Sequence, residues 1–249
     1  MIYAVGGLGT QTLRDHRVLR RRKFILYNKS IPLVNEDIAD SLGCMTFSES
    51  ALREQVLTWL AAQVPAPRLA HCLRVEAMAV ALANHYGLDQ SVAAQAGLMH
   101  DLAKYFKPQR LLTLASKAGL PIDPVDEAHP HLLHADVSAL VAQQEFGVVD
   151  RDVLDGIANH TLGHPAMAPL SCIVFLADSL EPGRGHTPQL NHLRSLCYQD
   201  LPTAVYQTCD ATLTHLMERG RPIHPRAVLT RNWFLAVSQR ASAPYPQAV

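Results

Sequence analysis

The sequence predicts an all-α protein in which a single bundle of helices forms the core. From about residue 50 onward, apolar residues recur at the spacing of one helix face, and glycines and prolines separate the segments. No stretch shows the sustained alternation of apolar and polar residues, bounded by turn signals, that indicates a half-buried strand. A hydrophobic content of 48% over 249 residues is sufficient for a sizeable buried core.

The first helices can be placed from their start and stop signals. Either Ser48 or Ser50 can cap a first helix, whose apolar residues then follow at helical spacing. A second helix is expected over 68–87, where Gly87 supplies a C-terminal stop. The third expected helix, 90–106, is rich in small residues, which favours close packing against its neighbours.

Prolines and glycines divide the rest of the chain. They predict a loop between Gly119 and His131 and a second loop over 182–188. Apolar periodicity predicts helices between and after these loops. These helices are expected around 131–147, 150–163, 170–183, 189–198, 203–219 and 225–238.

The expected domain boundaries follow from a change in composition near residue 45. The glycine-rich run GGLGT near the start lacks the spacing and the lysine of a phosphate-binding loop, and seven of the 22 Lys and Arg lie within the first 30 residues. We expect 1–45 to be an N-terminal extension, either flexible or upstream of the true start. The helical domain is expected over 46–240 and a C-terminal tail over 241–249.

Charge balance, apolar runs and cysteine content narrow the class of protein. The 22 basic residues balance 22 acidic ones, and beyond the N-terminal run there is no basic excess of the kind that binds nucleic acid. No apolar run is long enough to cross a membrane, and no secretory signal is recognisable. The five cysteines show no regular pairing, which is typical of reduced thiols. We expect a cytoplasmic protein that binds neither nucleic acid nor membranes, and a homodimer is left open.

The most informative feature is the run GLMHDLAK, in which His100 and Asp101 are neighbours within an apolar segment. Adjacent helical residues point about 100° apart, so the pair cannot form the polar edge of one amphipathic stripe. Asp178 likewise interrupts an apolar run, where an unpaired carboxylate would be costly. A lone buried histidine is usually satisfied by hydrogen bonds in the core, so each residue alone is weak evidence. A shared cation is the simplest explanation of all of them together.

Six such residues lie on five different predicted helices. Imidazole and carboxylate groups together suit iron, manganese, cobalt, zinc or another divalent first-row metal. Six ligands, one of them an aspartate able to bridge, are enough for two ions, and the spacing of a zinc finger is absent. The candidate metal ligands are His71, His100, Asp101, His134, His160 and Asp178.

The order of these residues resembles the HD superfamily of metal-dependent phosphohydrolases, whose signature is H…HD…D on a helical bundle. The runs RLAHCLRV, AGLMHDLAK, PHLLHADVSALVA, IANHTLGHPAM and FLADSLEPGR sharpen the resemblance to the bacterial YqeK group of symmetrical diadenosine tetraphosphate hydrolases. It implies an HD-domain helical bundle and a di-iron centre held by the six residues, with Asp101 as the bridging carboxylate. His129 and His131 lie close to His134, but LLH matches the family at His134.

The resemblance also implies a reaction. The family hydrolyses diadenosine tetraphosphate at its central phosphoanhydride to two ADP, and a hydroxide that bridges two metal ions is the expected nucleophile. Lys104 lies one helical turn beyond the dyad and is expected to stabilise charge on the phosphoryl oxygens. The expected catalytic residues are Asp101, Lys104 and His164. The expected substrate-binding residues are Lys104, Thr161, His164 and Arg184, with a dinucleoside polyphosphate as the partner molecule.

Neighbouring residues carry weaker expectations. Glu181 would orient Arg184 or a water molecule, with a solvated side chain equally compatible with its position. Tyr105 and Phe106, beside the dyad, would flank the nucleotide or, more simply, pack in the core. None of these residues decides the function by itself.

The sequence leaves other functions open. A nucleotidase or deoxynucleotide phosphohydrolase of the wider HD superfamily would use the same centre on a different substrate. A non-catalytic regulator would bind a metal or a nucleotide without turnover, and a helical interaction module would need no metal. A cyclic-dinucleotide phosphodiesterase is disfavoured because no GYP motif follows HDLAK.

Overall fold

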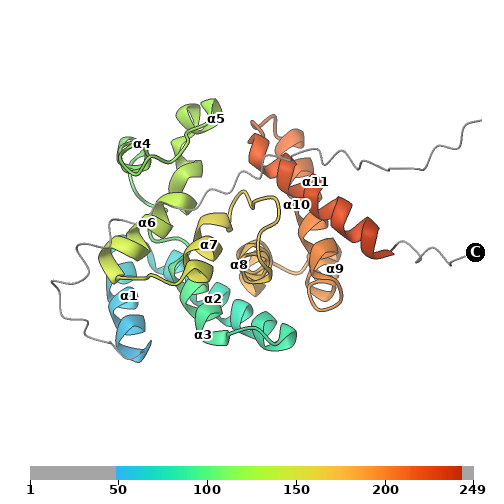
Figure 1. Cartoon of the computed structure of the whole chain (residues 1–249), viewed down its shortest axis with the longest axis horizontal. Helices are drawn as coiled ribbons and strands as arrows, with labels where there is room; N and C mark the ends of the chain where they lie inside the picture. Colours follow the sequence, from blue (N-terminus) through green and yellow to red (C-terminus); the bar gives the residue numbers. More distant parts are fainter. Residues whose placement is uncertain (1–48, 243–249) are drawn as a thin grey trace, which may run out of the picture. The chain divides into compact units, whose positions relative to one another are not determined.

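The computed structural model describes residues 49–242. Residues 1–48 and 243–249 lie outside the described part, and with them the predicted N-terminal extension and its GGLGT run. Within the described part every regular element is a helix, which confirms the all-α prediction (Figure 1). None of the described helices is long and apolar enough to span a bilayer. In chain order the elements are α1 (Glu49–Gln63), α2 (Ala66–Tyr86), α3 (Gln90–Met99), α4 (Pro108–Lys117), α5 (Pro124–Ala128), the 3₁₀ turn η2 (Pro130–Leu133), α6 (His134–Phe146), α7 (Arg151–Asn159), α8 (Pro169–Leu180), the 3₁₀ turn η3 (Pro182–Arg184), α9 (Pro188–Leu196), α10 (Leu201–Glu218) and α11 (Pro225–Ser242).

Helices α2, α3, α7 and α8 form the centre of the described bundle. Helix α3 packs against α2 and α7, and α8 packs against α2, α7 and α10 (Figure 1). Fully buried side chains such as Leu82, Leu154 and Ile173 fill the space between these helices. The helices approach closely because α3 carries small residues, and a Cβ atom at Gly97 would lie only 2.9 Å from Cα of Glu76 in α2. The close packing predicted for this small-residue helix is confirmed.

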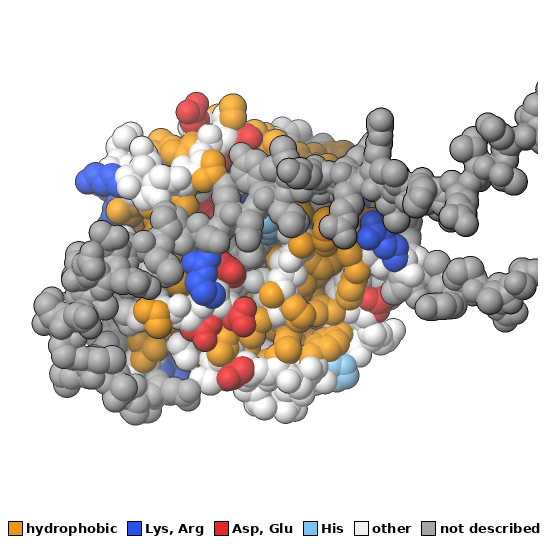
Figure 2. All heavy atoms as spheres, in the orientation of Figure 1, with side chains coloured by type: hydrophobic (Ala, Val, Ile, Leu, Met, Phe, Trp, Pro, Cys, Tyr) orange, Lys and Arg blue, Asp and Glu red, His pale blue; other side chains and the backbone are white. Residues whose placement is uncertain are grey.

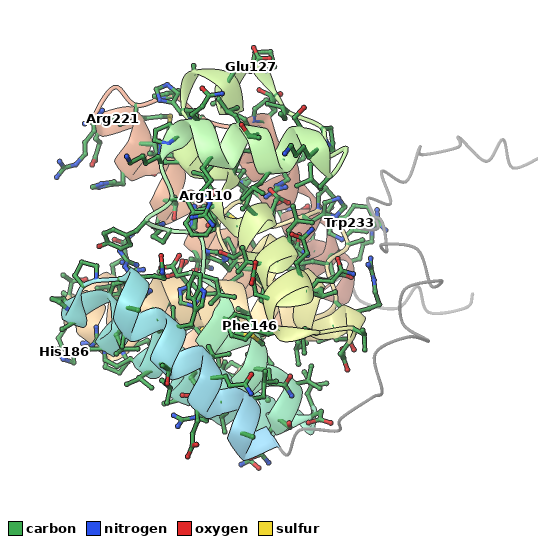
Figure 3. All side chains as sticks on the ribbon, turned by 90° about the vertical axis from the view of Figure 1, so that its left-hand side faces the viewer. Arg110, Glu127, Phe146, His186, Arg221 and Trp233 are labelled. Atoms are coloured by element: carbon green, nitrogen blue, oxygen red, sulfur yellow. The ribbon has the colours of Figure 1, made fainter. Side chains whose placement is uncertain are left out.

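Helix α1 covers one side of the bundle through aromatic contacts. The ring of Trp59 lies 6.3 Å from that of Phe106 and 6.1 Å from that of Phe146, measured between centroids. The guanidinium carbon of Arg110 lies 3.6 Å from the centre of the Phe106 ring; Figure 3 views this side, with Arg110 and Phe146 labelled. Phe106 therefore has a packing role, whereas the neighbouring Tyr105 is 52% exposed.

The helix that precedes the His–Asp dyad ends earlier than predicted. Helix α3 stops at Met99, and residues 100–105 form turns in which the amide of Lys104 donates to the carbonyl of Asp101 at 3.0 Å. The ring of His100 explains the stop, because its Nδ1 donates to the carbonyl of Gly97 at 2.7 Å. A continued helix would pair that carbonyl with the amide of residue 101. The expectation of a single helix over 90–106 is therefore wrong, and the dyad lies just beyond a helix end.

Two smaller expectations also need correction. The predicted loop between 119 and 131 contains α5 and the first residues of η2, because Asp123 and Asp126 form a reciprocal capping box at the start of α5. Of the two candidate caps for α1, Ser50 lies inside the helix, which begins at Glu49, and Ser48 lies outside the described residues. Helices α9, α10 and α11 begin and end within four residues of the predicted positions.

The described surface carries charges of both signs. On the face shown in Figure 2, Lys and Arg side chains stand beside Asp and Glu side chains, without a broad area of one sign. Elsewhere on the described surface, partly exposed charges form ion pairs, such as the pair between Arg231 and Asp210. The described residues visible on this face therefore form no basic area of the size that nucleic-acid binding requires.

Candidate metal centre

The six candidate ligands converge at one place in the fold. They come from α2, the end of α3, the start of α6, the end of α7, and α8. Two sets of three side chains have ligand atoms within 4.8 Å of one another. We call them the His71 group (His71, His100 and Asp101) and the His134 group (Asp101, His134 and His160).

Asp101 belongs to both groups, and Asp178 lies beside the first. Oδ1 of Asp178 is 3.0 Å from Nε2 of His71 and 3.7 Å from Nε2 of His100. The four histidines and Asp101 are at most 5% exposed. The structure thus brings all six residues together, as the sequence predicted, with five of them buried and the Asp178 side chain 19% exposed; their role as ligands stays a prediction.

Three of the histidines are oriented in the same way. His100, His134 and His160 each follow the end of a helical segment, and each ring places Nδ1 at 2.6–2.7 Å from the backbone carbonyl three residues earlier. A carbonyl only accepts hydrogen bonds, so Nδ1 must donate in all three rings. Nε2 is then the atom that each neutral ring turns toward the cluster, which is how metal-bound histidines are usually held.

The Nε2 atoms meet in pairs. Those of His71 and His100 are 3.3 Å apart, and those of His134 and His160 are 3.1 Å apart. Oδ1 of Asp101 lies 3.3 Å from Nε2 of His134 and 3.6 Å from Nε2 of His160. Among residues 49–242 this buried oxygen has no hydrogen-bond partner. The converging lone pairs of His134 and His160, together with an unpartnered carboxylate oxygen, fit a bound cation.

The protonation states of the cluster also suit a divalent metal. Burial lowers the pKa of His134 to about 4 and also lowers the pKa of His160, so both rings are neutral at pH 7. Burial alone would raise the pKa of Asp101, but the charge of the neighbouring His100 holds it well below its ordinary value. Neutral imidazoles and ionised carboxylates are the forms that bind metals.

His100 differs from the other two helix-end histidines. Burial would lower the pKa of His100, yet the negative charge of Asp101, reinforced by Asp178, raises it. The neighbouring carboxylates therefore favour a proton on this ring more than water does. A cation bound to the His71 group would compete with that proton, so metal binding there is expected to release it.

Glu181 holds the ring of His71 from behind. Its Oε1 lies 3.0 Å from Nδ1 of His71, and its other oxygen accepts from Nε of Arg74 and from the amide of Gly183. Burial alone would raise the pKa of Glu181, but these hydrogen bonds lower it to about 2. The expectation that Glu181 orients Arg184 or is solvated is wrong, because the side chain is 1% exposed and binds His71 and Arg74.

Three partly exposed cations surround the buried cluster. Nζ of Lys104 lies 2.9 Å from Nε2 of His134, and Nη2 of Arg184 lies 2.7 Å from Oδ1 of Asp178. The third cation, Arg68, donates from Nη1 to Oδ2 of Asp101 at 2.8 Å. Their side chains are 33%, 39% and 24% exposed, respectively, so they connect the cluster with solvent.

Arg68 is not among the site residues predicted from the sequence, although its spacing from His71 was a signal for it. It precedes His71 by three residues in α2, and residues at this spacing share a helix face. Once His71 was considered a ligand, a cation one turn earlier was therefore a candidate for the same site. Lys104 and Arg184, by contrast, lie at the centre where the sequence placed them.

The remaining predicted substrate contacts divide into two cases. Oγ1 of Thr161 lies 3.2 Å from Nε2 of His134, so Thr161 is part of the centre. Nδ1 of His164 is instead 2.6 Å from the carbonyl of Pro165. Within the described residues no hydrogen bond or ion pair joins the His164 side chain to the six ligand candidates. Its catalytic role stays a prediction without a contact to support it.

Comparison with known proteins places these observations in a family. Residues 68–183 match the HD domain. The chain is 34% identical over 186 residues to the symmetrical bis(5'-nucleosyl)-tetraphosphatase of Bacillus subtilis (strain 168), which covers 75% of this chain and 99% of that protein. It is 35% identical over 168 residues to the protein of the same name from Halalkalibacterium halodurans, covering 68% of this chain and 89% of that one.

A solved structure agrees with the sequence comparisons. The crystal structure of a predicted HD superfamily hydrolase involved in NAD metabolism, from Clostridium acetobutylicum, superimposes with a TM-score of 0.71 and 30% sequence identity. The similarity covers 74% of this chain and 97% of that one. The matched HD segment begins at Arg68 and ends at Gly183, so it contains all six candidate ligands together with Glu181.

Proposed function

The chain belongs to the HD-domain family, in the group of the symmetrical bis(5'-nucleosyl)-tetraphosphatases, and on this premise we propose that it hydrolyses diadenosine tetraphosphate to two ADP. In this reaction the oxygen of water joins one of the two central phosphorus atoms, and the bond from that phosphorus to the central bridging oxygen breaks. The observation that carries the proposal is the position of Asp101, whose carboxylate is shared by two buried three-ligand groups.

The proposed cofactor is a pair of divalent metal ions, with iron as the proposed metal and manganese, cobalt and zinc as alternatives. The His71 group with Asp178 would hold one ion, and the His134 group would hold the other. The paired Nε2 atoms and the unpartnered Oδ1 of Asp101 support this assignment. Such ions supply a water of lowered pKa and positive charge for the phosphate oxygens.

The protein's own side chains bind and orient the polyphosphate. Lys104, Arg68 and Arg184 place three positive charges between the buried ligands and solvent, where a chain of phosphates carries its negative charge. Lys104 lies on the side of the shared, unpartnered oxygen: its Nζ is 3.9 Å from Oδ1 of Asp101 and 2.9 Å from Nε2 of His134, whereas Arg68 pairs with the other oxygen, Oδ2. We therefore assign Lys104 to the reacting phosphoryl group and Arg184 to a flanking phosphate. Thr161 would donate its hydroxyl to the same chain of phosphates.

We also infer a cytoplasmic location. Cys72, Cys172, Cys197 and Cys209 are free and buried, and burial raises the pKa of each thiol to about 12. Free cysteines suit a reducing compartment such as the cytoplasm.

The same four cysteines bear on the mechanism, because buried thiols that stay protonated do not act as nucleophiles. Their burial supports hydrolysis by an activated water instead of a covalent thiol intermediate.

Product analysis tests the function directly. The chain, purified without chelator and supplied with Fe²⁺, would be incubated with diadenosine tetraphosphate and the nucleotides separated. ADP as the sole product, lost in Asp101→Asn and retained in Asp210→Asn, is the expected result; Asp210 pairs with Arg231 on a different part of the fold. AMP together with ATP would overturn the symmetrical cleavage. If the metal-loaded chain does not turn over diadenosine tetraphosphate, the proposed substrate is wrong.

A further inference from the structure

The C-terminal helix α11 lies outside residues 68–183, the segment that matches the HD domain, yet it contacts the chain beside two candidate ligands. Nη1 of Arg226 donates to both carboxylate oxygens of Asp136, at 3.2 and 3.1 Å. Asp136 follows His134 by two residues on α6. Both side chains are largely buried, at 14% and 17% exposure. This ion pair therefore ties α11 to the first turn of the helix that carries His134.

The same face of α11 contacts the backbone on both sides of His160. Nη2 of Arg226 lies 3.5 Å from the carbonyl of Ala158, two residues before His160. Oγ1 of Thr230 lies 3.0 Å from the carbonyl of Leu162, two residues after it, and 2.9 Å from the carbonyl of Arg226 in its own helix, so the two carbonyls share its single hydroxyl proton. These contacts fix the segment in which α7 ends and His160 turns its ring toward the cluster.

The fit around Thr230 depends on a glycine. Thr230 is fully buried, and a Cβ atom at Gly163 would lie 2.4 Å from Cγ2 of Thr230. Gly163 also has a φ of 63°, a left-handed conformation that other residues adopt at a cost. The backbone that follows His160 thus allows α11 to pack closely against it at Gly163.

The start of α11 is anchored separately. Nε2 of His224 lies 3.2 Å from Oδ2 of Asp126 in α5, and both residues are buried. The amide of Arg226 donates to Nδ1 of His224 at 3.0 Å. Arg226 is therefore held from its backbone side while its guanidinium reaches Asp136.

Stability alone is a poor explanation for Arg226. Its Nε is buried and, among residues 49–242, has no hydrogen-bond partner. An unpaired buried N–H group costs free energy, and an apolar side chain at this position would not carry that cost. Buried ion pairs are often no more stabilising than apolar side chains of similar size. The contacts of Arg226 with Asp136 and Ala158 do, however, fix the chain beside His134 and His160.

We propose that Arg226 and Thr230 make α11 the positioning element of the His134 group, a role that rests on the proposed two-metal function. The His71 group has its own support in Glu181, which lies within the HD segment. The two halves of the centre are thus held by different parts of the chain. Changes at Arg226 or Thr230 should affect one metal position and leave the other unchanged.

The test measures metal binding, not activity. Metal-free protein would be titrated with Co²⁺ by calorimetry, and the visible absorption of the bound ion recorded at each step. Arg226→Gln and, separately, Thr230→Val should weaken one of two binding events about tenfold and change the absorption that accompanies it. Arg226→Lys should restore most of the affinity. The matched control, Arg231→Gln, changes another arginine of α11, breaks its ion pair with Asp210 of α10, and should leave both events unchanged.

A second variant identifies which event is affected. Glu181→Gln, which alters the contact to His71, should weaken the other binding event. Unchanged affinities in Arg226→Gln and Thr230→Val, with two ions bound to the wild-type chain, would overturn the inference and leave the proposed function standing. Equal weakening of both events, with a lower midpoint of unfolding, would also overturn it by showing a general structural role. A wild-type chain that binds fewer than two ions would contradict the proposed function and the inference together.

Discussion

Nε2 of His134 faces Nε2 of His160 at 3.1 Å, and both rings use Nδ1 to donate to a backbone carbonyl. Because burial keeps both rings neutral at pH 7, two lone pairs point at each other in a site of low dielectric. The ammonium of Lys104, 2.9 Å from Nε2 of His134, relieves only part of this repulsion. A cation shared by the two rings would turn an unfavourable contact into a favourable one.

Metal should therefore stabilise the fold. With a divalent ion at one hundred times its dissociation constant, binding contributes about 2.7 kcal/mol, which raises the unfolding midpoint of a chain of this size by about 5–10 °C. Thermal unfolding of chelator-treated protein, before and after addition of Mn²⁺, measures the shift. Asp101→Asn should lose most of it and Asp210→Asn should retain it. Identical midpoints with and without metal in the wild-type chain would contradict the predicted site.

The pKa of Glu181 predicts a dependence of stability on pH. The pKa is lowered from 4.5 to about 2 in the folded chain, so the unfolded chain binds the proton more readily. The resulting stabilisation, at most about 3 kcal/mol, is fully present above pH 4.5 and is lost as the pH falls from 4.5 toward 2. Urea unfolding of the wild type and of Glu181→Gln between pH 7 and pH 3 measures the difference. The two curves should converge at acid pH, and Glu145→Gln, at an exposed glutamate, should run parallel to the wild type.

Lys104 and Arg184 should affect the kinetics differently. Lys104 lies against the dyad, so Lys104→Gln should lower kcat by about 10–100-fold through loss of transition-state charge stabilisation. Arg184 binds Asp178 from the edge of the cluster, so Arg184→Gln should mainly raise KM for diadenosine tetraphosphate. Steady-state kinetics of both variants, with Lys107→Gln at an exposed neighbouring lysine as the control, distinguish the two effects. A normal kcat in Lys104→Gln would remove Lys104 from the catalytic residues.

Gly183 should be required for the support of His71. A Cβ atom there would lie 2.5 Å from Nε of Arg74, so Gly183→Ala should displace the guanidinium from Glu181 and weaken the binding of one metal ion. The expected loss is smaller than that of Glu181→Gln, because the contact between Glu181 and His71 remains. In the background of Arg74→Gln the alanine should have little further effect, which a double-mutant cycle of Co²⁺ affinity would reveal. Additive losses would mean that Gly183 acts in another way.

The residues that meet at the centre could be predicted because each interrupts an apolar segment. His100 and Asp101 are buried where the sequence offers no polar stripe, and Asp178 interrupts an apolar run. Their orientation could not be predicted in the same way. The carbonyl contact of His100 exists only because α3 ends at Met99, and helix ends are set by competition between side-chain and backbone hydrogen bonds.

The role of Glu181 depends on contacts that lie far away in the sequence. His71 precedes it by 110 positions and Arg74 by 107, so no local pattern joins the three side chains. The resemblance to a family marks the motif that contains Glu181 without indicating its partner. The same holds for Arg226, whose partner Asp136 is 90 positions away. Tertiary structure was needed to identify both contacts.

The helix-end position of His100, His134 and His160 has a consequence for how such a chain can change in length. An extra residue just before one of these histidines would rotate its ring by about 100° and advance it about 1.5 Å, out of reach of its partners. The same insertion at the opposite end of the helix, or in the loop beyond it, leaves the ring where it is. Insertions and deletions should therefore accumulate among relatives at the ends of α3 and α7 that begin with Gln90 and Arg151, and be excluded from the ends that lead into His100 and His160.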